Sequence, residues 1–137
     1  MSTPNPAPAG ARSIRVSAAV IVNDRDELLL VRKAGTTAFM QPGGKPEPDE
    51  TPAETLCREL FEELGLSVDA AHLRPLGLFT AAAANEPGFL VVADVFEVDI
   101  ADQLPVTASE IEDLRWVGHA EAEELEVAPL ARENFLR

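Results

Sequence analysis

The spacing of apolar side chains predicts strands along most of the chain and one long helix near its middle. From Ile14 to Val22, apolar residues recur at every second position, which predicts a strand with one apolar face. A polar turn over residues 23–26 leads to Leu28–Val31, a continuous apolar run typical of a buried strand. Three later segments also predict strands: residues 73–84 with a break near Pro75, residues 89–98 and residues 114–117.

Local signals at both ends place the predicted helix over residues 52–64. Thr51 can cap its first turn, and Glu54 three residues later completes a capping box. Pro52 occupies the first helical position, where its missing N–H costs nothing, and Gly65 can end the helix in a left-handed conformation. One apolar stripe runs along the helix and is expected to pack on a core: Ala53, Leu56, Leu60 and Leu64.

Two apolar segments near the end of the chain, residues 121–125 and 130–136, predict helices, and Pro129 opens the second. Strands around a long central helix and a C-terminal helix predict an α/β fold with a mixed sheet between helices. With 137 residues, the chain is expected to form one domain, over residues 12–137. Residues 1–11 are rich in Pro and Ala, and we expect a disordered lead-in there rather than a secretion signal.

Composition and charge exclude several classes of protein. No apolar run approaches the ~18 residues of a membrane-spanning helix, and the single cysteine, Cys57, favours a reducing cytoplasm. The net charge is −13, and residues 46–137 carry 21 acidic against five basic side chains. Such a chain is not expected to bind nucleic-acid polymers through their phosphates. A small phosphorylated molecule stays open, because a metal ion and a few local cations can offset the repulsion.

The predicted helix carries an acidic cluster that indicates a bound cation. Glu59, Glu62 and Glu63 stand at i, i+3 and i+4, so their like charges are neighbours on the helix surface and repel. Mg²⁺ prefers such oxygen ligands and usually also engages substrate phosphates. Arg58 has an acid four residues away on either side and can pair with either. Ahead of the helix, the paired glycines of Gln41–Pro46 predict a loop whose backbone approaches a ligand.

Residues 44–66 resemble the Nudix box, G-x5-E-x7-R-E-U-x-E-E-x-G-U, in which U is apolar. Every fixed position is met: Gly44, Glu50, Arg58, Glu59, Glu62, Glu63 and Gly65, with Leu60 and Leu66 at apolar positions. Fixed residues at set spacing are far more specific than a lone glycine motif. The resemblance implies an α/β/α sandwich and a metal-dependent hydrolase that cleaves nucleoside diphosphates linked to another group.

The resemblance also implies roles for the residues of the box. Glu59 and Glu63 are expected to bind Mg²⁺, with Mn²⁺ as an alternative. Glu62 is expected to act as a further ligand or as the general base. Arg58 is expected to orient a carboxylate, and Gly44 to offer its carbonyl oxygen to the metal.

The roles of three other acids are left open. Family members often use an acid outside the box, on a loop before the last core strand. Glu110 fits that place and is the candidate catalytic residue there, with Glu112 as the alternative. Glu50, inside the box, is either structural or part of the metal shell.

Substrate contacts are expected from basic and aromatic side chains near the glycine loop. Arg32 is favoured as a phosphate contact over Lys33 and Lys45, which belong to the same basic segment. Phe39 and Phe79 are candidates for a base pocket, and packing in the core is the alternative for both.

Residues that mark several subgroups of the family are missing. The chain has no tyrosine, which argues against dinucleoside polyphosphates, and Ala81 stands where ADP-ribose enzymes have a proline. A MutT-like enzyme acting on (d)NTPs is therefore expected, with ADP-ribose or nucleotide-sugar hydrolysis as an alternative. A non-catalytic nucleotide sensor and a diphosphate isomerase are the competing classes. The resemblance is compatible with a homodimer, although the sequence reveals no interface.

Overall fold

The computed structural model describes residues 12–136, so the lead-in expected over residues 1–11 lies outside the described residues. The strands are β1 (Arg12–Val20), β2 (Leu28–Lys33), β3 (Gly43–Gly44), β4 (Arg74–Ala82), β5 (Phe89–Glu97) and β6 (Ile111–Val117). The helices are α1 (Pro52–Leu64), the short 3-10 helix η1 (Ala70–His72), α2 (His119–Ala122) and α3 (Pro129–Asn134). None of these helices, within the described residues, is long and apolar enough to span a membrane.

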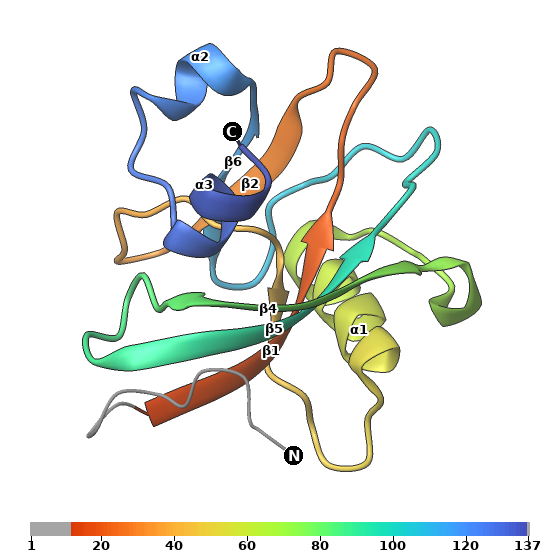
Figure 1. Cartoon of the computed structure of the whole chain (residues 1–137). Coiled ribbons are helices and arrows are strands. Elements are labelled where there is room, and N and C mark those ends of the chain that lie inside the picture. Colours follow the sequence, from red (N-terminus) through yellow and green to blue (C-terminus); the bar gives the residue numbers. More distant parts are fainter. Residues whose placement is uncertain (1–11, 137) are drawn as a thin grey trace.

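The strands form a mixed sheet and a smaller antiparallel pair (Figure 1). The four-stranded sheet has the order β3-β1-β5-β4, in which β1 and β5 run parallel and the other neighbours run antiparallel. The strands β2 and β6 pair with each other in a second sheet. One core layer joins the sheets to α1 and another joins them to α3. The predicted α/β fold with a mixed sheet between helices is therefore confirmed.

The burial of residues along strand β1 differs from the single apolar face that the sequence predicted. Its first half is exposed or half-buried, but Ala18, Ala19, Val20 and Ile21 are buried in succession. Ala18 and Val20 belong to the core layer of α3, whereas Ala19 and Ile21 belong to that of α1. The prediction of a single apolar face was wrong for this half, because the strand runs between two core layers.

The later strands were predicted well and the terminal helices less well. Strands β4 and β5 pair as expected, and the predicted break occurs as an irregularity between Pro75 and Gly77. Strand β6 begins at Ile111, ahead of the predicted residue 114, because it pairs with the whole of β2. Helix α2 lies over His119–Ala122 instead of the predicted residues 121–125, and α3 ends at Asn134.

Helix α1 has the predicted bounds and caps. The Thr51 hydroxyl accepts a hydrogen bond from the Glu54 backbone N–H (3.2 Å), and Glu54 Oε1 accepts one from the Thr51 N–H (2.9 Å). Gly65 ends the helix with φ 68°, a conformation that glycine adopts without steric cost. The apolar stripe is fully buried at Leu56, Leu60 and Leu64. The helix face next to this stripe carries the acids, and Glu59 and Glu63 lie against the glycines of β3. This contact positions the candidate site.

Candidate active site

One arginine, Arg58, donates hydrogen bonds to three of the acids of the candidate site. The Arg58 guanidinium donates to both carboxylate oxygens of Glu50, from Nε at 2.7 Å and from Nη2 at 3.0 Å. Its Nη1 donates to Glu59 Oε2 at 3.0 Å and to Glu62 Oε1 at 3.2 Å. Of the two acids four residues away, Arg58 thus pairs with Glu62, because Glu54 caps the helix. We call Glu50, Arg58, Glu59 and Glu62 the Arg58 cluster.

Glu50 has no free carboxylate oxygen in this arrangement. Besides the two bonds from Arg58, its Oε1 accepts from the Glu47 N–H (2.8 Å) and from the Thr55 hydroxyl (3.0 Å). The hydrogen bonds from Arg58, then that from Glu47, lower the pKa of Glu50 to about 2. Of the two roles left open for Glu50, this geometry supports the structural one, which is to hold Arg58 in place.

Glu63 lies on the other side of the cluster and is buried, with 3% of its surface exposed. Burial raises the pKa of Glu63 to about 8, opposed by a hydrogen bond from the Gly43 N–H (3.2 Å) and reinforced by the nearby negative charge of Glu59. Burial also raises the pKa of Glu59, against the opposing hydrogen bond from Arg58. Glu63 is therefore held away from water, and Glu59 partly so, beside the short strand β3.

The two residues of that strand, β3, must be glycines for the site to form. Gly43 has φ 150°, and a Cβ there would collide with the Ser17 carbonyl of β1. A Cβ at Gly44 would overlap the carboxylate of Glu59. Backbone and carboxylate therefore approach more closely here than any side chain allows.

The donor chemistry of this region fits a hard divalent cation. Within residues 12–136, no three His, Cys, Asp or Glu side chains are already gathered around one point as metal ligands. The positive charge beside these acids is that of Arg58, whose Nη1 donates to oxygens of both Glu59 and Glu62. The carboxylates of Glu59 and Glu63 beside the Gly44 backbone are nevertheless the all-oxygen donors that Mg²⁺ prefers.

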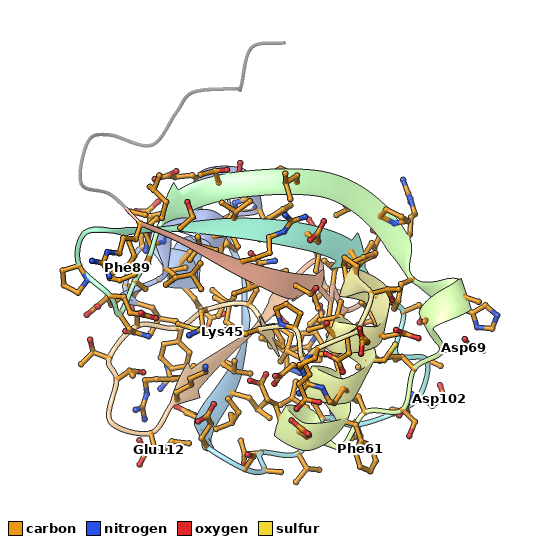
Figure 2. All side chains as sticks on the ribbon, turned by 90° about the horizontal axis from the view of Figure 1, so that it is seen from below. Lys45, Phe61, Asp69, Phe89, Asp102 and Glu112 are labelled. Carbon is orange, nitrogen blue, oxygen red and sulfur yellow. The ribbon has the colours of Figure 1, made fainter. Side chains whose placement is uncertain are left out.

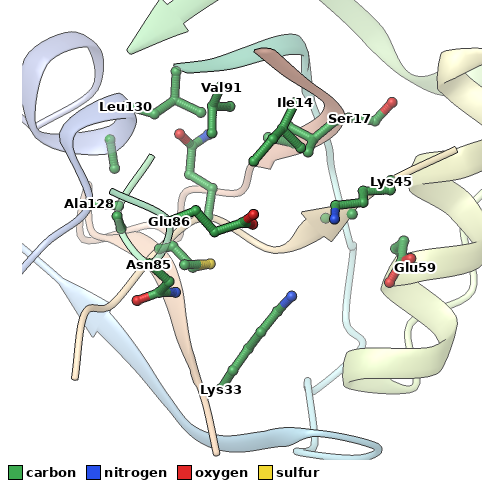
Figure 3. A pocket seen from close by; sticks show the side chains of 18 of the residues that line it. Ile14, Ser17, Lys33, Lys45, Glu59, Asn85, Glu86, Val91, Ala128 and Leu130 are labelled. Atoms are coloured by element: carbon green, nitrogen blue, oxygen red, sulfur yellow. The ribbon is translucent and has the colours of Figure 1, made fainter. Parts of the chain in front are cut away.

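A pocket of about 390 Å³ opens beside these acids. At the end next to α1 it is lined by Gly43, Gly44, Lys33, Lys45, Glu59 and Glu110. Figure 3 shows the ammonium groups of Lys33 and Lys45 directed toward the middle of the pocket. The rest of the wall comes from β1, β5, α3, residues 40–41 ahead of β3, and the turn between β4 and β5. We call these two parts the acid end and the far end.

The structure brings one predicted catalytic acid to the pocket and leaves its alternative outside. Glu110 lines the acid end, and its Oε1 lies 3.4 Å from Lys33 Nζ. Glu112 does not line the pocket; it accepts a bond from Arg32 Nη1 at 2.8 Å and lies at the outer edge of the molecule in Figure 2.

Three predicted substrate contacts do not reach the pocket. Arg32 is tied to Glu112 and to the Thr36 carbonyl, because neighbouring residues of β2 point in opposite directions and Lys33 takes the pocket side. Phe39 is buried, with the guanidinium groups of Arg32 and Arg115 over its ring at 5.9 and 5.3 Å. Phe79 packs edge-on against Phe135, with ring centroids 5.2 Å apart.

Sequence reasoning missed the residues of the far end. Gln41, Asn85 and Glu86 line the pocket together with aliphatic side chains. Gln41 is the first residue of the predicted glycine loop. Its position directly after the apolar residues 38–40 is the signal by which the sequence could have indicated it. Asn85 and Glu86 lie in a hairpin turn, where polar residues are ordinary and carry no signal.

Comparisons with known proteins agree with this architecture. The chain matches the NUDIX domain over residues 13–137. It is 31% identical over 107 residues to a MutT-like protein of Streptomyces ambofaciens, a match that covers 78% of this chain and 65% of that protein. An RNA pyrophosphohydrolase of Marinomonas sp. is 47% identical over 47 residues, which are 34% of this chain and 29% of that protein.

A solved structure is similar over nearly the whole chain. The crystal structure of a MutT protein from Methanosarcina mazei superposes with a TM-score of 0.71 at 25% identity, over 92% of this chain and 91% of that one. The chain spans less than two thirds of the length of the curated relatives named above.

Proposed function

The chain belongs to the NUDIX family, and from that premise we propose that it is a metal-dependent hydrolase that cleaves the diphosphate linkage of a nucleotide. The observation that carries this proposal is the glycine pair of β3 packed between two acids. Glu63 is buried and accepts from the Gly43 N–H, and the half-buried Glu59 lies against Gly44 and lines a pocket together with Lys33 and Lys45. A free (d)NTP is the substrate class that we favour.

The residues of the acid end divide the work of such a reaction. Glu59 and Glu63 would hold Mg²⁺ or Mn²⁺ through carboxylate oxygens, with Gly44 offering its carbonyl and Glu62 a further oxygen. When bound, the ion neutralises phosphate charge and lowers the pKa of a bound water. Arg58 keeps the Glu59 carboxylate in one orientation, since its Nη1 donates to Oε2 at 3.0 Å. This arrangement limits the reorganisation needed during the reaction.

The remaining charged side chains act on the phosphates and on the attacking water. Lys33 and Lys45 line the acid end of the pocket, and we assign them to the phosphate oxygens of the substrate. We assign the general base to Glu110, because it lines the pocket, whereas Glu62 is hydrogen-bonded to Arg58 and does not line it. A carboxylate oxygen of Glu110 then takes the proton of the water, a step that typically contributes ~10²–10⁴-fold.

Other substrates and classes have weaker support. An RNA end would meet a chain of net charge −13, and the match to the RNA pyrophosphohydrolase of Marinomonas sp. covers only 34% of this chain. ADP-ribose and nucleotide sugars stay as alternatives. A non-catalytic sensor has no need of the complete set of acids that this chain retains. The cytoplasm and a homodimer stay predictions.

The proposal is tested by incubating the protein with Mg²⁺ and each of the dNTPs, CTP, nucleotide sugars and ADP-ribose. Products are identified by mass spectrometry in H₂¹⁸O, which also locates the phosphorus atom attacked. We expect hydrolysis of at least one nucleoside triphosphate and none without a divalent ion. Tight nucleotide binding without turnover would instead support the sensor.

A further inference from the structure

The far end of the pocket contains a buried acceptor without a partner. Gln41 is 7% exposed, and its Nε2 donates to the Ala19 carbonyl at 3.0 Å. Its Oε1 is buried and is without a hydrogen-bond partner among residues 12–136. The assignment of oxygen and nitrogen is secure on chemical grounds, because the flipped amide would place two acceptors against each other. Buried polar groups are nearly always paired, so this oxygen calls for an explanation.

A second acceptor lines the same pocket from another element. Glu86, in the turn between β4 and β5, directs its carboxylate into the pocket in Figure 3. Within the described residues, its side chain has no hydrogen bond or ion pair. The basic side chains in the lining are Lys33 and Lys45, both at the acid end, and the far end has none among the described residues. A bound nucleotide would therefore have its phosphates beside these lysines and its base beside Glu86.

The walls around these acceptors are aliphatic. Ile14, Val16, Val91 and Leu130 line the far end, and the described residues contribute no aromatic ring to the pocket. A base held here lies between alkyl groups, and its edge must be recognised by hydrogen bonds. Because the Gln41 oxygen is shielded, a base edge reaches it only when part of the lining shifts, and the lining includes the flexible side chain of Met40.

From this geometry we infer that the far end selects nucleotides whose base carries an exocyclic amino group. Such a group donates N–H bonds to Gln41 Oε1 and to the Glu86 carboxylate, whereas a keto oxygen at the same position faces an acceptor. Adenine, cytosine and guanine satisfy this requirement; uracil, thymine and hypoxanthine do not. This inference rests on the proposed function and narrows its substrate class.

The first test compares bases that differ at one group. We expect kcat/KM to be about tenfold or more higher for CTP than for UTP and for ATP than for ITP, as for one added hydrogen bond to a buried acceptor. Gln41→Met, which removes the acceptor but keeps the length, should bring both ratios close to one. Gln103→Met is the matched control, because Gln103 also bonds backbone but lies outside the pocket. Equal loss on both members of each pair would overturn the inference and leave Gln41 a structural residue.

A second variant covers the case in which Gln41→Met fails to fold. Glu86→Ala removes the other acceptor from an exposed turn, and should lower the CTP to UTP ratio severalfold, with Glu123→Ala as the exposed control. An unchanged ratio in this variant, together with a wild-type ratio near one, would overturn the inference.

Binding separates this inference from the proposed function. Calorimetry with CMP against UMP, and AMP against IMP, measures base preference without hydrolysis. If no nucleotide is cleaved but the amino-bearing monophosphates bind tighter, the inference stands and the proposed function fails. Equal affinities, with a water on Gln41 Oε1 in a crystal structure, would mean that solvent satisfies the oxygen, and the inference would fall.

Discussion

Glutamates line both ends of the pocket, but their surroundings differ, and we expect them to have different roles. At the acid end, Glu59 is held by Arg58, and Glu63 is held by the Gly43 N–H and by its burial. At the far end, Glu86 stands on a turn and has no partner within the described residues. A side chain that takes part in the reaction must be held in one orientation. A side chain that recognises a ligand must keep its hydrogen-bonding atoms available for that ligand. Changes at the acid end should therefore slow all substrates alike, and changes at the far end should alter the choice among them.

The largest expected effect comes from removing a buried acid. Glu63→Gln should lower kcat about 10²-fold or more for every nucleotide, because a neutral amide binds Mg²⁺ poorly. The fold should keep or gain stability, since a buried ionisable group is replaced by a neutral one. Steady-state kinetics and thermal melting check both parts, with Glu123→Gln as control. Retained activity would remove Glu63 from the metal site.

Adding a methyl group at the β3 strand should be nearly as damaging. Gly44→Ala places a Cβ into the Glu59 carboxylate and should destabilise the fold by about 1–3 kcal/mol while reducing kcat for all substrates. Gly118→Ala is the control, since the nearest atom to its Cβ is at 3.8 Å. Urea unfolding and kinetics measure the two effects. An active Gly44→Ala protein of normal stability would contradict the close approach described here.

The Arg58 cluster predicts a dependence of stability on pH. The pKa of Glu50 falls from 4.5 to about 2 on folding, so its ionisation stabilises the fold above pH 4.5 and this contribution is lost as the pH falls toward 2. Glu50→Gln should therefore melt at a lower temperature than wild type at pH 7, and the difference should shrink below pH 4.5. Melting curves across this range check the sign. A difference that grows in acid would show that Glu50 does not hold Arg58.

A smaller loss is expected at the edge of the acid end. Glu110→Gln should lower kcat about tenfold or more with little change in stability, because its carboxylate is assigned as the base. Glu112→Gln is the matched control, two residues away but paired with Arg32 outside the pocket. If the two variants have equal rates, Glu110 is a surface charge.

The smallest effect concerns the aromatic residue that the sequence suggested for base stacking. Phe39→Leu should lower stability, because the ring is buried in the core. The ratio of kcat/KM for CTP and UTP should stay within about twofold of wild type. A larger change in that ratio would place Phe39 in contact with the base and weaken the contrast between the two ends.

Helix α1 and the positions of its acids were predicted well, because the signals for them are local. Thr51 and Gly65 define the helix within a few residues, and helical spacing then puts Glu59, Glu62 and Glu63 side by side. The strands around the pocket carry no such signal. Arg32 and Lys33 point to opposite sides of β2, so the side on which the pocket lies decides which of them faces the ligand. That side is set by the pairing of β2 with β6.

The far end could not be predicted for a related reason. It joins residues of β1, α3 and the turn between β4 and β5, which are distant in sequence. In the sequence, Gln41 is only a polar residue after an apolar segment, and its unpaired oxygen is visible in the structure alone. The alternation in β1 likewise predicted one buried face, since nothing local reveals that a second core layer covers the other.

The glycine pair of β3 also bears on how this protein can diversify. A Cβ at Gly43 would meet the backbone of β1, which cannot give way, and a Cβ at Gly44 would force the Glu59 carboxylate to move. A larger residue at either position would therefore disturb the acids of the candidate site. New substrate preferences must be acquired through the distant hairpin and the aliphatic wall, where exchanges leave the hydrolytic machinery untouched.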